Sequence, residues 1–417
     1  MPGLRCYDVR DAGETNVFLE HRLERLIAKL KRSAAIPLRL ELWNGRAFDL
    51  ASEPKVKIGV PSPSALRFLL SPDLMKLGQA YVEGTLRVEG PILEVFRVAE
   101  SFARGAASHG GRGLRRVWRH SRKRDRDAIQ YHYDVSNDFY SLWLDRNMVY
   151  SCAYFRGETD SLELAQEQKL DHILDKLLLK PGERFLDVGC GWGALILRAA
   201  KKYGARATGV TLSRNQYEFA AQRIREEGLE GRCEVRLQDY RDIPGEGVFD
   251  KIASVGMFEH VGLRHLKAYF AKIRSLLAEG GLVMNHGITA SDPDNRWVGL
   301  GAGEFINHYV FPHGELPHLS LVLREMTGAG LEVADAESLR RHYARTCLEW
   351  ARRLEQNREQ AIAAAGDKRY RIWQIYLAGC AHGFENEWMN VYQVLARKEG
   401  AGSNPLPLTR DYMYRAG

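Results

Sequence analysis

A glycine-rich stretch at residues 184–193 carries the residue types that most directly indicate ligand binding in this chain. An apolar run at 185–188 has the character of a short buried strand. Gly189, Gly191 and Gly193 follow, and glycines allow a tight turn in which backbone amides approach a ligand closely. A helical pattern begins next, so the positive end of its dipole would face the same ligand. The stretch therefore predicts a loop that binds a nucleotide-type cofactor.

The residues around this loop distinguish between cofactors. A P-loop needs Gly-Lys-Ser/Thr, whereas this loop continues Trp192-Gly193-Ala194-Leu195. A dinucleotide site usually has an acid about 20 residues further on for the ribose, whereas the second strand ends Gly209-Val210-Thr211-Leu212-Ser213. Asp187, the missing lysine and the Gly-x-Gly-x-Gly spacing together favour S-adenosylmethionine, a cation without phosphates. A strand–turn–helix without a ligand is the alternative.

Strands and helices alternate regularly after the loop. We expect helices at 192–203, 214–227 and 263–278, and strands at 205–213, 233–239, 250–257 and 281–289. Such alternation predicts an α/β fold with a doubly wound, mostly parallel sheet, which binds ligands beyond the carboxyl ends of its strands. The polar residues expected at those ends are Asp187, Thr211 to Gln216, Gln238-Asp239-Tyr240, Glu259-His260 and His286. We expect them to converge on one cleft.

The 417 residues predict two domains and two further segments. These are a small α+β domain at 1–110, a basic linker at 111–128, the sheet domain at 129–400 and a C-terminal tail at 401–417. Residues 17–32 form an amphipathic helix, whose apolar side would lie on a membrane or pack on the first domain. The pattern lapses at 290–320, which predicts a long loop such as a lid. Helices at 342–364 and 368–389 and a strand at 391–398 should follow.

Charge and cysteines narrow the function classes. The net charge is +7, and residues 112–127 hold eight basic and two acidic side chains. Such a block suits nucleic acid, an anionic bilayer or water alone, and no nucleic-acid motif accompanies it. We find no apolar run near the roughly 18 to 20 residues of a membrane span and no signal-peptide pattern, so we expect a cytoplasmic protein. Six scattered cysteines without a C-x-x-C pair predict neither a metal site nor disulfides.

Five motifs in order resemble the cyclopropane-fatty-acyl-phospholipid synthase family, relatives of the mycolic acid cyclopropane synthases. They are Tyr150-Ser151-Cys152-Ala153-Tyr154-Phe155, Leu186-Asp187-Val188-Gly189-Cys190-Gly191-Trp192-Gly193, Gly209-Val210-Thr211-Leu212-Ser213, Gly256-Met257-Phe258-Glu259-His260-Val261-Gly262, and Phe311-Pro312 through Leu316-Pro317. The resemblance covers residues 75–400. It implies a class I methyltransferase fold with a seven-stranded sheet, a smaller lipid-handling domain before it, S-adenosylmethionine and bicarbonate as cofactors, and a homodimer.

The resemblance also assigns residues to the site. Cofactor contacts fall on Tyr150, Ser151, Asp187, Gly189, Cys190, Gly191, Gly193, Thr211, Gln216, Gln238, Asp239 and Tyr240. The bicarbonate site falls on Cys152, Glu259, His286, Ile288 and Tyr343. The stretch Asn285-His286-Gly287-Ile288 differs from relatives, which often have leucine before the histidine and threonine after it. This difference bears on the alkene position or the lipid head group more than on the chemistry.

The chemistry implied by the resemblance makes specific demands. A double bond is a poor nucleophile, so the methyl sulfonium must be held in line with it and water kept from the carbocation that forms. Aromatic rings would stabilise that charge by about 0.5 to 2 kcal/mol each, and the candidates are Tyr133, Tyr140, Phe258 and Trp350. Ring closure needs a base, for which bicarbonate would be held by Glu259, His286 and Tyr343. Cys152 would contribute its backbone amide.

We therefore expect transfer of a methylene group to the double bond of unsaturated phospholipid acyl chains, giving a cyclopropane ring. The protein would lie peripherally at the inner face of the cytoplasmic membrane, with 112–126 and 17–32 on its anionic surface. A related lipid C-methyltransferase would instead give a methyl or methylene branch, as in furan-fatty-acid pathways. A small-molecule O- or N-methyltransferase and a catalytically retired lipid-binding protein are further alternatives.

Overall fold

The computed structural model describes residues 9–33, 36–106, 136–294, 299–312, 314–400 and 404–414. Their contacts divide the chain into two compact units. Among the described residues, unit 1 takes the chain up to 106 together with 299–310 and 367–379, and unit 2 takes the rest. The basic residues at 112–126 and Tyr133 lie outside the described residues.

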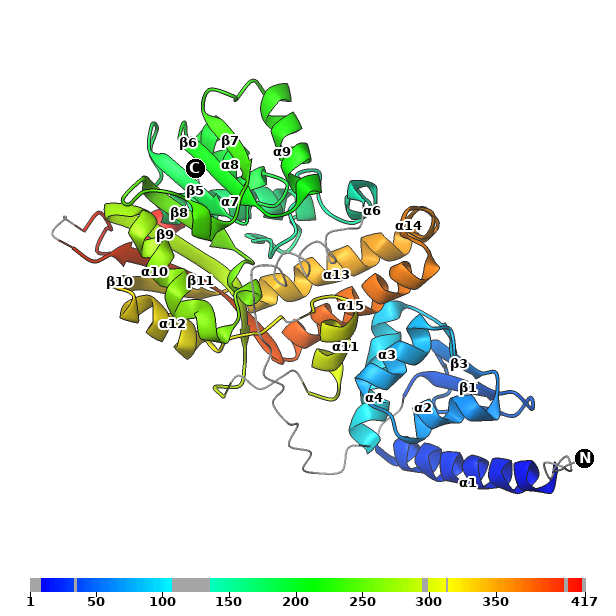
Figure 1. Ribbon diagram of the computed structural model, residues 1–417. Coiled ribbons are helices and arrows are strands. Elements are labelled where there is room, and N and C mark those ends of the chain that lie inside the picture. The colour runs from blue at the N-terminus through cyan, green and yellow to red at the C-terminus, as the bar shows by residue number, and fades with distance from the viewer. Residues whose placement is uncertain are drawn as a thin grey trace, which may run out of the picture. The chain divides into compact units, whose positions relative to one another are not determined.

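Unit 1 is built on a small mixed sheet. The strand order is β2 (Ala47–Asp49), β1 (Leu38–Leu42), β3 (Val56–Val60) and β4 (Arg87–Glu89), with β1 and β3 parallel. Its helical elements are α1 (Val9–Ser33), η1 (Pro63–Leu66), α2 (Arg67–Leu70), α3 (Leu74–Val82), α4 (Ile92–Ala106) and α11 (Ala302–Tyr309) (Figure 1). Leu23, Ile27 and Leu30 of α1 are at most 4% exposed. The amphipathic pattern of this helix is therefore explained by packing inside unit 1.

Unit 2 contains the predicted doubly wound, mostly parallel seven-stranded sheet. Its strand order is β10 (Leu331–Ser338), β11 (Met389–Lys398), β9 (Leu277–Ala290), β8 (Phe249–Val255), β5 (Arg184–Val188), β6 (Arg206–Thr211) and β7 (Cys233–Leu237). Only β11 runs antiparallel to its neighbours within this sheet. Strand β5, next to the central strand β8, leads into the glycine turn, which places that turn at the carboxyl edge of the sheet.

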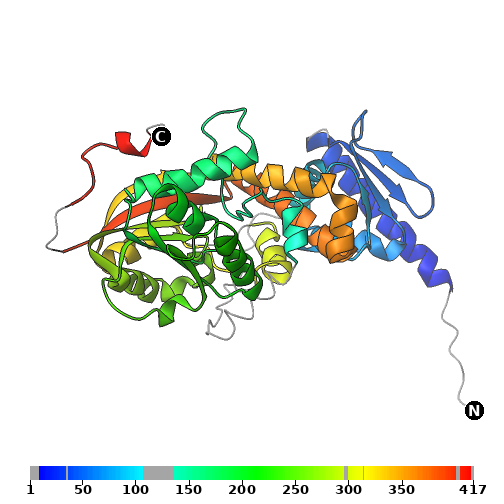
Figure 2. The same cartoon turned by 90° about the horizontal axis from the view of Figure 1, so that it is seen from above.

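Helices cover both faces of this sheet (Figures 1 and 2). Leucines and isoleucines of α7 (Leu162–Lys176) and α8 (Ala194–Lys202) share one core with Phe185, Met284 and Leu395 of the strands. On the other face, α10 (Leu266–Leu276) and α12 (Leu319–Gly328) share a second core with Leu186 and Val394. Unit 2 also contains α6 (Asn137–Ser141), α9 (Arg214–Glu226), η2 (Tyr240–Asp242), η3 (Phe258–His260), η4 (Leu263–His265) and η5 (Asp411–Met413).

Three elements differ from the prediction. Strand β10 was not predicted because its sequence, LEVADAES, places acidic residues along an edge strand and has a register shift between Val333 and Asp335. The expected loop at 290–320 contains α11 and the start of α12. The single helix expected at 342–364 is α13 (Arg340–Gln356) followed by α14 (Arg358–Ala365), and α15 (Asp367–Glu385) begins after Gly366, whose φ is +83°. Within the described ranges, no helix is long and apolar enough to cross a bilayer.

Candidate functional site

The turn after β5 needs glycine for steric reasons. Gly193 caps the amino end of α8 with φ +89°, a left-handed conformation that other residues rarely adopt. A Cβ atom on Gly193 would lie 2.9 Å from the Cβ of Ala220. The glycine therefore lets α8 start close to α9, and the amino end of α8 remains directed at the turn.

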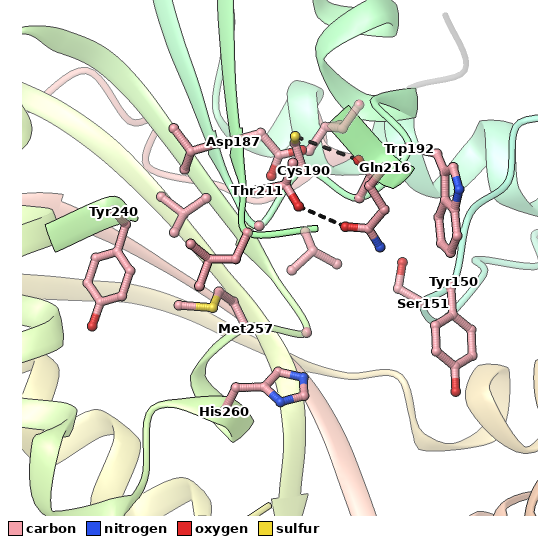
Figure 3. Close-up of a pocket in the computed structure, with 18 of the residues that line it drawn as sticks. Tyr150, Ser151, Asp187, Cys190, Trp192, Thr211, Gln216, Tyr240, Met257 and His260 are labelled. Carbon is pink, nitrogen blue, oxygen red and sulfur yellow. Dashed lines mark hydrogen bonds between the residues drawn. The ribbon is translucent and has the colours of Figure 1, made fainter. Parts of the chain in front are cut away.

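A cavity of about 320 Å³ opens beside this turn. All but one of the predicted cofactor residues line it: Tyr150, Ser151, Asp187, Gly189, Cys190, Gly191, Thr211, Gln216, Gln238, Asp239 and Tyr240. Gly193 is the exception, since it acts on the backbone of the turn. Figure 3 shows Tyr240 at one end of the cavity, Tyr150, Ser151 and Trp192 at the other, and Asp187 and Thr211 between them. Sequence segments between residues 148 and 268 thus form one pocket.

A buried carboxylate lies at the centre of the cavity. Asp187 is 3% exposed, and its Oδ1 has no hydrogen-bond partner among the described residues. Burial raises the pKa of Asp187 to about 7, although the charge of Lys169 opposes this shift. A buried carboxylate with an unpaired oxygen fits a cationic ligand, because a positive charge nearby would restore its ionised form.

Lys169 is a residue of this cavity that the sequence interpretation missed. It projects from α7, is buried, and its Nζ donates a 2.8 Å hydrogen bond to Ser151 Oγ. Burial lowers the pKa of Lys169 to about 8. The available signal was a lysine directly before Leu170 and four residues before Ile173, a spacing that places it on the apolar side of a helix.

Polar side chains at the ends of β6 and β7 are fixed before any ligand binds. Thr211 Oγ1 donates to Gln216 Oε1 at 2.8 Å, and the Ser213 hydroxyl caps α9. Both carboxylate oxygens of Asp239 accept from Arg241, at 2.6 to 3.0 Å. This preorganisation lowers the entropy lost when a cofactor is bound.

Glu259 and Ile288 come together next to the cavity. Glu259 lies in η3, and its Oε1 accepts a 2.7 Å hydrogen bond from the backbone amide of Ile288 at the end of β9. Glu259 Oε2 is buried and has no partner among the described residues. Burial raises the pKa of Glu259 to about 7 from its ordinary 4.5. The neighbouring Met257 and His260 line the cavity, whereas Glu259 does not.

His286 lies two residues before Ile288 in β9, so the two side chains project from the same face of the sheet. Its Nδ1 is 3.2 Å from Gln393 Nε2, and its Nε2 has no partner within the described ranges. Burial lowers the pKa of His286 to about 3, and the charges of Lys169 and Lys176 add to this shift. The imidazole is therefore neutral at physiological pH.

Cys152 and Tyr343 form a second group around Leu339. The Cys152 thiol lies 3.7 Å from the Leu339 carbonyl oxygen, which also accepts from the Tyr343 amide at 2.9 Å. Burial raises the pKa of Cys152, which keeps it a thiol rather than a thiolate. The Tyr343 ring stacks on the Phe384 ring, with 4.6 Å between the ring centroids. Of the five predicted bicarbonate residues, Glu259 and Ile288 are hydrogen-bonded, Cys152 and Tyr343 both contact the Leu339 carbonyl, and His286 contacts Gln393; none of the five lines the cavity.

Aromatic rings surround the Tyr150 end of the cavity. The ring centroid of Tyr150 lies 5.3 Å from that of Trp350 and 5.9 Å from that of Tyr140. The ring centroids of Tyr140 and Trp192 are 5.0 Å apart. Phe258 is buried because Gly287 has no side chain: a Cβ there would come 2.1 Å from its ring. Three of the four predicted aromatic candidates are therefore buried in unit 2.

Comparisons with known proteins assign the family. The model described as "Mycolic acid cyclopropane synthetase" matches residues 120–394, and one described as a domain of unknown function matches residues 26–108. The chain belongs to the mycolic acid cyclopropane synthetase family. It has a class I methyltransferase fold and is an S-adenosylmethionine-dependent methyltransferase.

Relatives within the family differ in how much of this chain they match. The "Probable fatty acid methyltransferase" of Pseudomonas putida is 49% identical over 385 residues, covering 92% of this chain and 98% of the relative. The "Tuberculostearic acid methyltransferase UfaA1" of Mycobacterium tuberculosis is 35% identical over 89% of this chain and 90% of its own length. The crystal structure of mycolic acid cyclopropane synthase CmaA1 complexed with SAH and CTAB has 36% identity and a TM-score of 0.62, over 66% of this chain and 98% of that one.

Proposed function

We propose that this methyltransferase acts on the double bond of unsaturated acyl chains in membrane phospholipids and closes the product to a cyclopropane ring. One observation carries the proposal: Glu259 Oε2 and His286 Nε2 are buried polar atoms without partners among the described residues, and the other Glu259 oxygen is bound to the amide of Ile288, two residues after His286 in β9. A buried polar group is costly unless it is hydrogen-bonded, so two such atoms indicate a bound polar group.

The cavity residues would bind and orient the methyl donor. S-adenosylmethionine supplies the methyl group when bound. Asp187 offers an unpaired carboxylate oxygen to this cation, and Thr211 and Gln216 offer hydroxyl and amide groups to a ribose. The aromatic rings around Tyr150 exclude water and present their negative faces to the positive charge that develops on the acyl chain.

The unpartnered atoms of Glu259 and His286 fit bicarbonate. Bicarbonate, when bound, supplies a base for the proton that leaves the new methyl group. His286 Nε2 would donate to this anion, and Glu259 Oε2 would accept from its hydroxyl. The Tyr343 phenol and the Cys152 backbone amide would complete the site, and the raised pKa of Cys152 keeps a competing thiolate away from the methyl donor.

A saturated or methylene-branched product is the second candidate. Relatives named as probable fatty acid methyltransferases match about nine-tenths of this chain, whereas "Cyclopropane mycolic acid synthase 1" of M. tuberculosis matches 65% of it. In this alternative the cation would gain a hydride to give a saturated methyl branch, or move by a hydride shift to the methyl-bearing carbon and lose a proton from the methyl group to give a methylene branch. A base at the methyl group supports loss of a methyl proton over gain of a hydride, and ring closure is the product of that loss that we propose.

The proposed substrate also requires that the protein contact a membrane surface. Substrate chains embedded in a bilayer require contact with its surface, and the basic residues at 112–126 suit an anionic one. These residues lie outside the described part of the chain, and the apolar face of α1 is already covered in unit 1. Peripheral binding at the inner face of the cytoplasmic membrane and a homodimer stay predictions.

Expression in a bacterium that lacks cyclopropane fatty acids tests the proposal. We expect phospholipid acyl chains to gain about 14 mass units, one CH₂ group. NMR of the isolated lipids should show cyclopropane protons at high field. An olefinic methylene signal or a saturated methyl branch would support the second candidate, and unchanged lipids together with failure to bind S-adenosylmethionine would contradict both.

A further inference from the structure

A row of buried polar side chains crosses the sheet next to the proposed base site. Glu337 in β10 pairs in register with Gln393 in β11, and Gln393 pairs in register with His286 in β9. Residues directly opposite each other in neighbouring strands have their side chains on the same face of the sheet. Helix α7 packs on this face and adds Lys176 and His172 to the row.

Lys176 faces hydrogen-bond acceptors on several sides. Its Nζ donates to Gln393 Oε1 at 3.1 Å and to Glu337 Oε2, and it lies 3.7 Å from Asp335 Oδ2. Burial raises the pKa of Glu337, but the His172 hydrogen bond and the Lys176 charge outweigh burial and lower it to about 2. Glu337 therefore stays ionised and holds the Lys176 ammonium in place.

The position of Lys176 determines how the Gln393 amide is oriented. A lysine ammonium has donors and no acceptor, so the amide oxygen of Gln393 must face it. The amide NH₂ then faces His286 Nδ1, at 3.2 Å. An NH₂ group donates, so Nδ1 must accept through its lone pair. A neutral imidazole that accepts at Nδ1 carries its proton on Nε2.

We propose that Gln393 and Lys176 are positioning residues that hold His286 in the neutral tautomer protonated at Nε2. The catalytic consequence of this tautomer rests on the proposed function. Its Nε2–H is then a fixed donor to the anion that we propose beside Glu259. The opposite tautomer would present a lone pair to an anion oxygen and repel it. Neither positioning residue lines the cavity, so neither touches a ligand bound there, and the contact that links them to the proposed base site is the one from Gln393 to His286.

The tautomer is measured directly by NMR of the full-length protein labelled with ¹⁵N-histidine. The chain has 13 histidines, and the spectrum of His286→Asn identifies the signals of His286. In the wild type we expect a pyrrole-type Nε2 and a pyridine-type Nδ1. Gln393→Glu puts an acceptor beside Nδ1 and should move the proton to Nδ1. Gln393→Leu and the double variant Lys176→Met/Glu337→Gln should give mixtures of both tautomers.

Activity separates positioning from a structural role. If packing alone matters, the near-isosteric Gln393→Glu should keep more activity than Gln393→Leu. We expect the reverse: kcat should fall by about 10- to 100-fold in Gln393→Glu and by less in Gln393→Leu, with the S-adenosylmethionine dissociation constant unchanged. Arg397→Met is the matched control, since it breaks an ion pair to Glu332 between the same two strands. It should change neither the tautomer nor kcat.

The outcomes for this inference and for the proposed function differ. A wild-type spectrum with the proton on Nδ1, or an unchanged tautomer in Gln393→Glu, would overturn the inference whatever the protein methylates. The expected tautomers in a protein that leaves acyl chains unmodified would uphold the inference and contradict the proposed function. If a variant fails to fold, the wild-type spectrum alone decides which nitrogen carries the proton.

Discussion

Replacing Glu259 by glutamine keeps one of the two hydrogen-bond acceptors of its carboxylate and removes the other. Glutamine Oε1 can still accept the 2.7 Å hydrogen bond from the Ile288 amide, so the backbone of β9 stays in place. The second oxygen, which is buried and without a described partner, becomes an NH₂ group that cannot accept a hydrogen bond from the hydroxyl of the proposed bicarbonate. A hydrogen bond to a charged group is worth about 1.5 to 3 kcal/mol, so we expect kcat to fall by about 10- to 150-fold.

The same substitution should change stability in a pH-dependent way. Burial raises the pKa of Glu259 from 4.5 to about 7, so ionising this group costs folding free energy. That cost is absent below pH 4.5, grows as the pH rises to 7, and is about 3 kcal/mol above it. The unfolding free energy of Glu259→Gln relative to wild type should therefore increase by about 3 kcal/mol between pH 4.5 and pH 8.

Two assays check this prediction. Release of S-adenosylhomocysteine with unsaturated phospholipid vesicles gives kcat, and urea unfolding at a series of pH values gives the stability difference. The dissociation constant of S-adenosylmethionine, measured by calorimetry, should not change, because Glu259 does not line the cavity. Wild-type kcat would refute a role for Glu259 in catalysis, and a pH-independent stability difference would refute its raised pKa.

Three further substitutions test other parts of the site. Asp187→Asn should weaken S-adenosylmethionine binding by about tenfold or more, because a charge-assisted contact is lost; equal affinity by calorimetry would contradict the assignment. Tyr343→Phe keeps the stack on Phe384, so we expect an unchanged melting temperature and a kcat about 10- to 100-fold lower, from loss of one donor; wild-type turnover would remove Tyr343 from the base site. Gly287→Ala should destabilise the protein by about 1 to 3 kcal/mol, since its Cβ would lie 2.1 Å from Phe258. The control Gly231→Ala meets no atom within 4 Å, and equal melting temperatures for the two variants would contradict the packing argument.

The sheet and the residues of the cavity at its carboxyl edge were predictable because their sequence signals are local. The apolar run before Gly189 and the regular return of apolar runs along the chain mark the parallel strands. The rule that ligands bind at the carboxyl ends then brings Asp187, Thr211 and Tyr240 together without any knowledge of distances. These residues do line one cavity.

The polar row behind His286 was not predictable in this way. Lys176 and Gln393 are 217 positions apart, and Lys176 and Glu337 are 161 apart. Their meeting depends on β11 inserting between β9 and β10, and β10 was not recognised because its acidic residues obscure the strand pattern. Lys169 was missed for a related reason. A lysine on a helix is expected to be exposed, and only the structure shows that Lys169 is buried beside Ser151.

The fate of the transferred methyl group tests the central claim most directly. Purified protein is given S-adenosylmethionine with a CD₃ methyl group and vesicles of an unsaturated phospholipid, and the product acyl chains are analysed by mass spectrometry and NMR. Ring closure removes one deuteron from the methyl carbon, so we expect a cyclopropane whose bridging carbon is CD₂. A saturated branch that keeps the whole CD₃ group would contradict the account, because no base would then have acted at the methyl carbon.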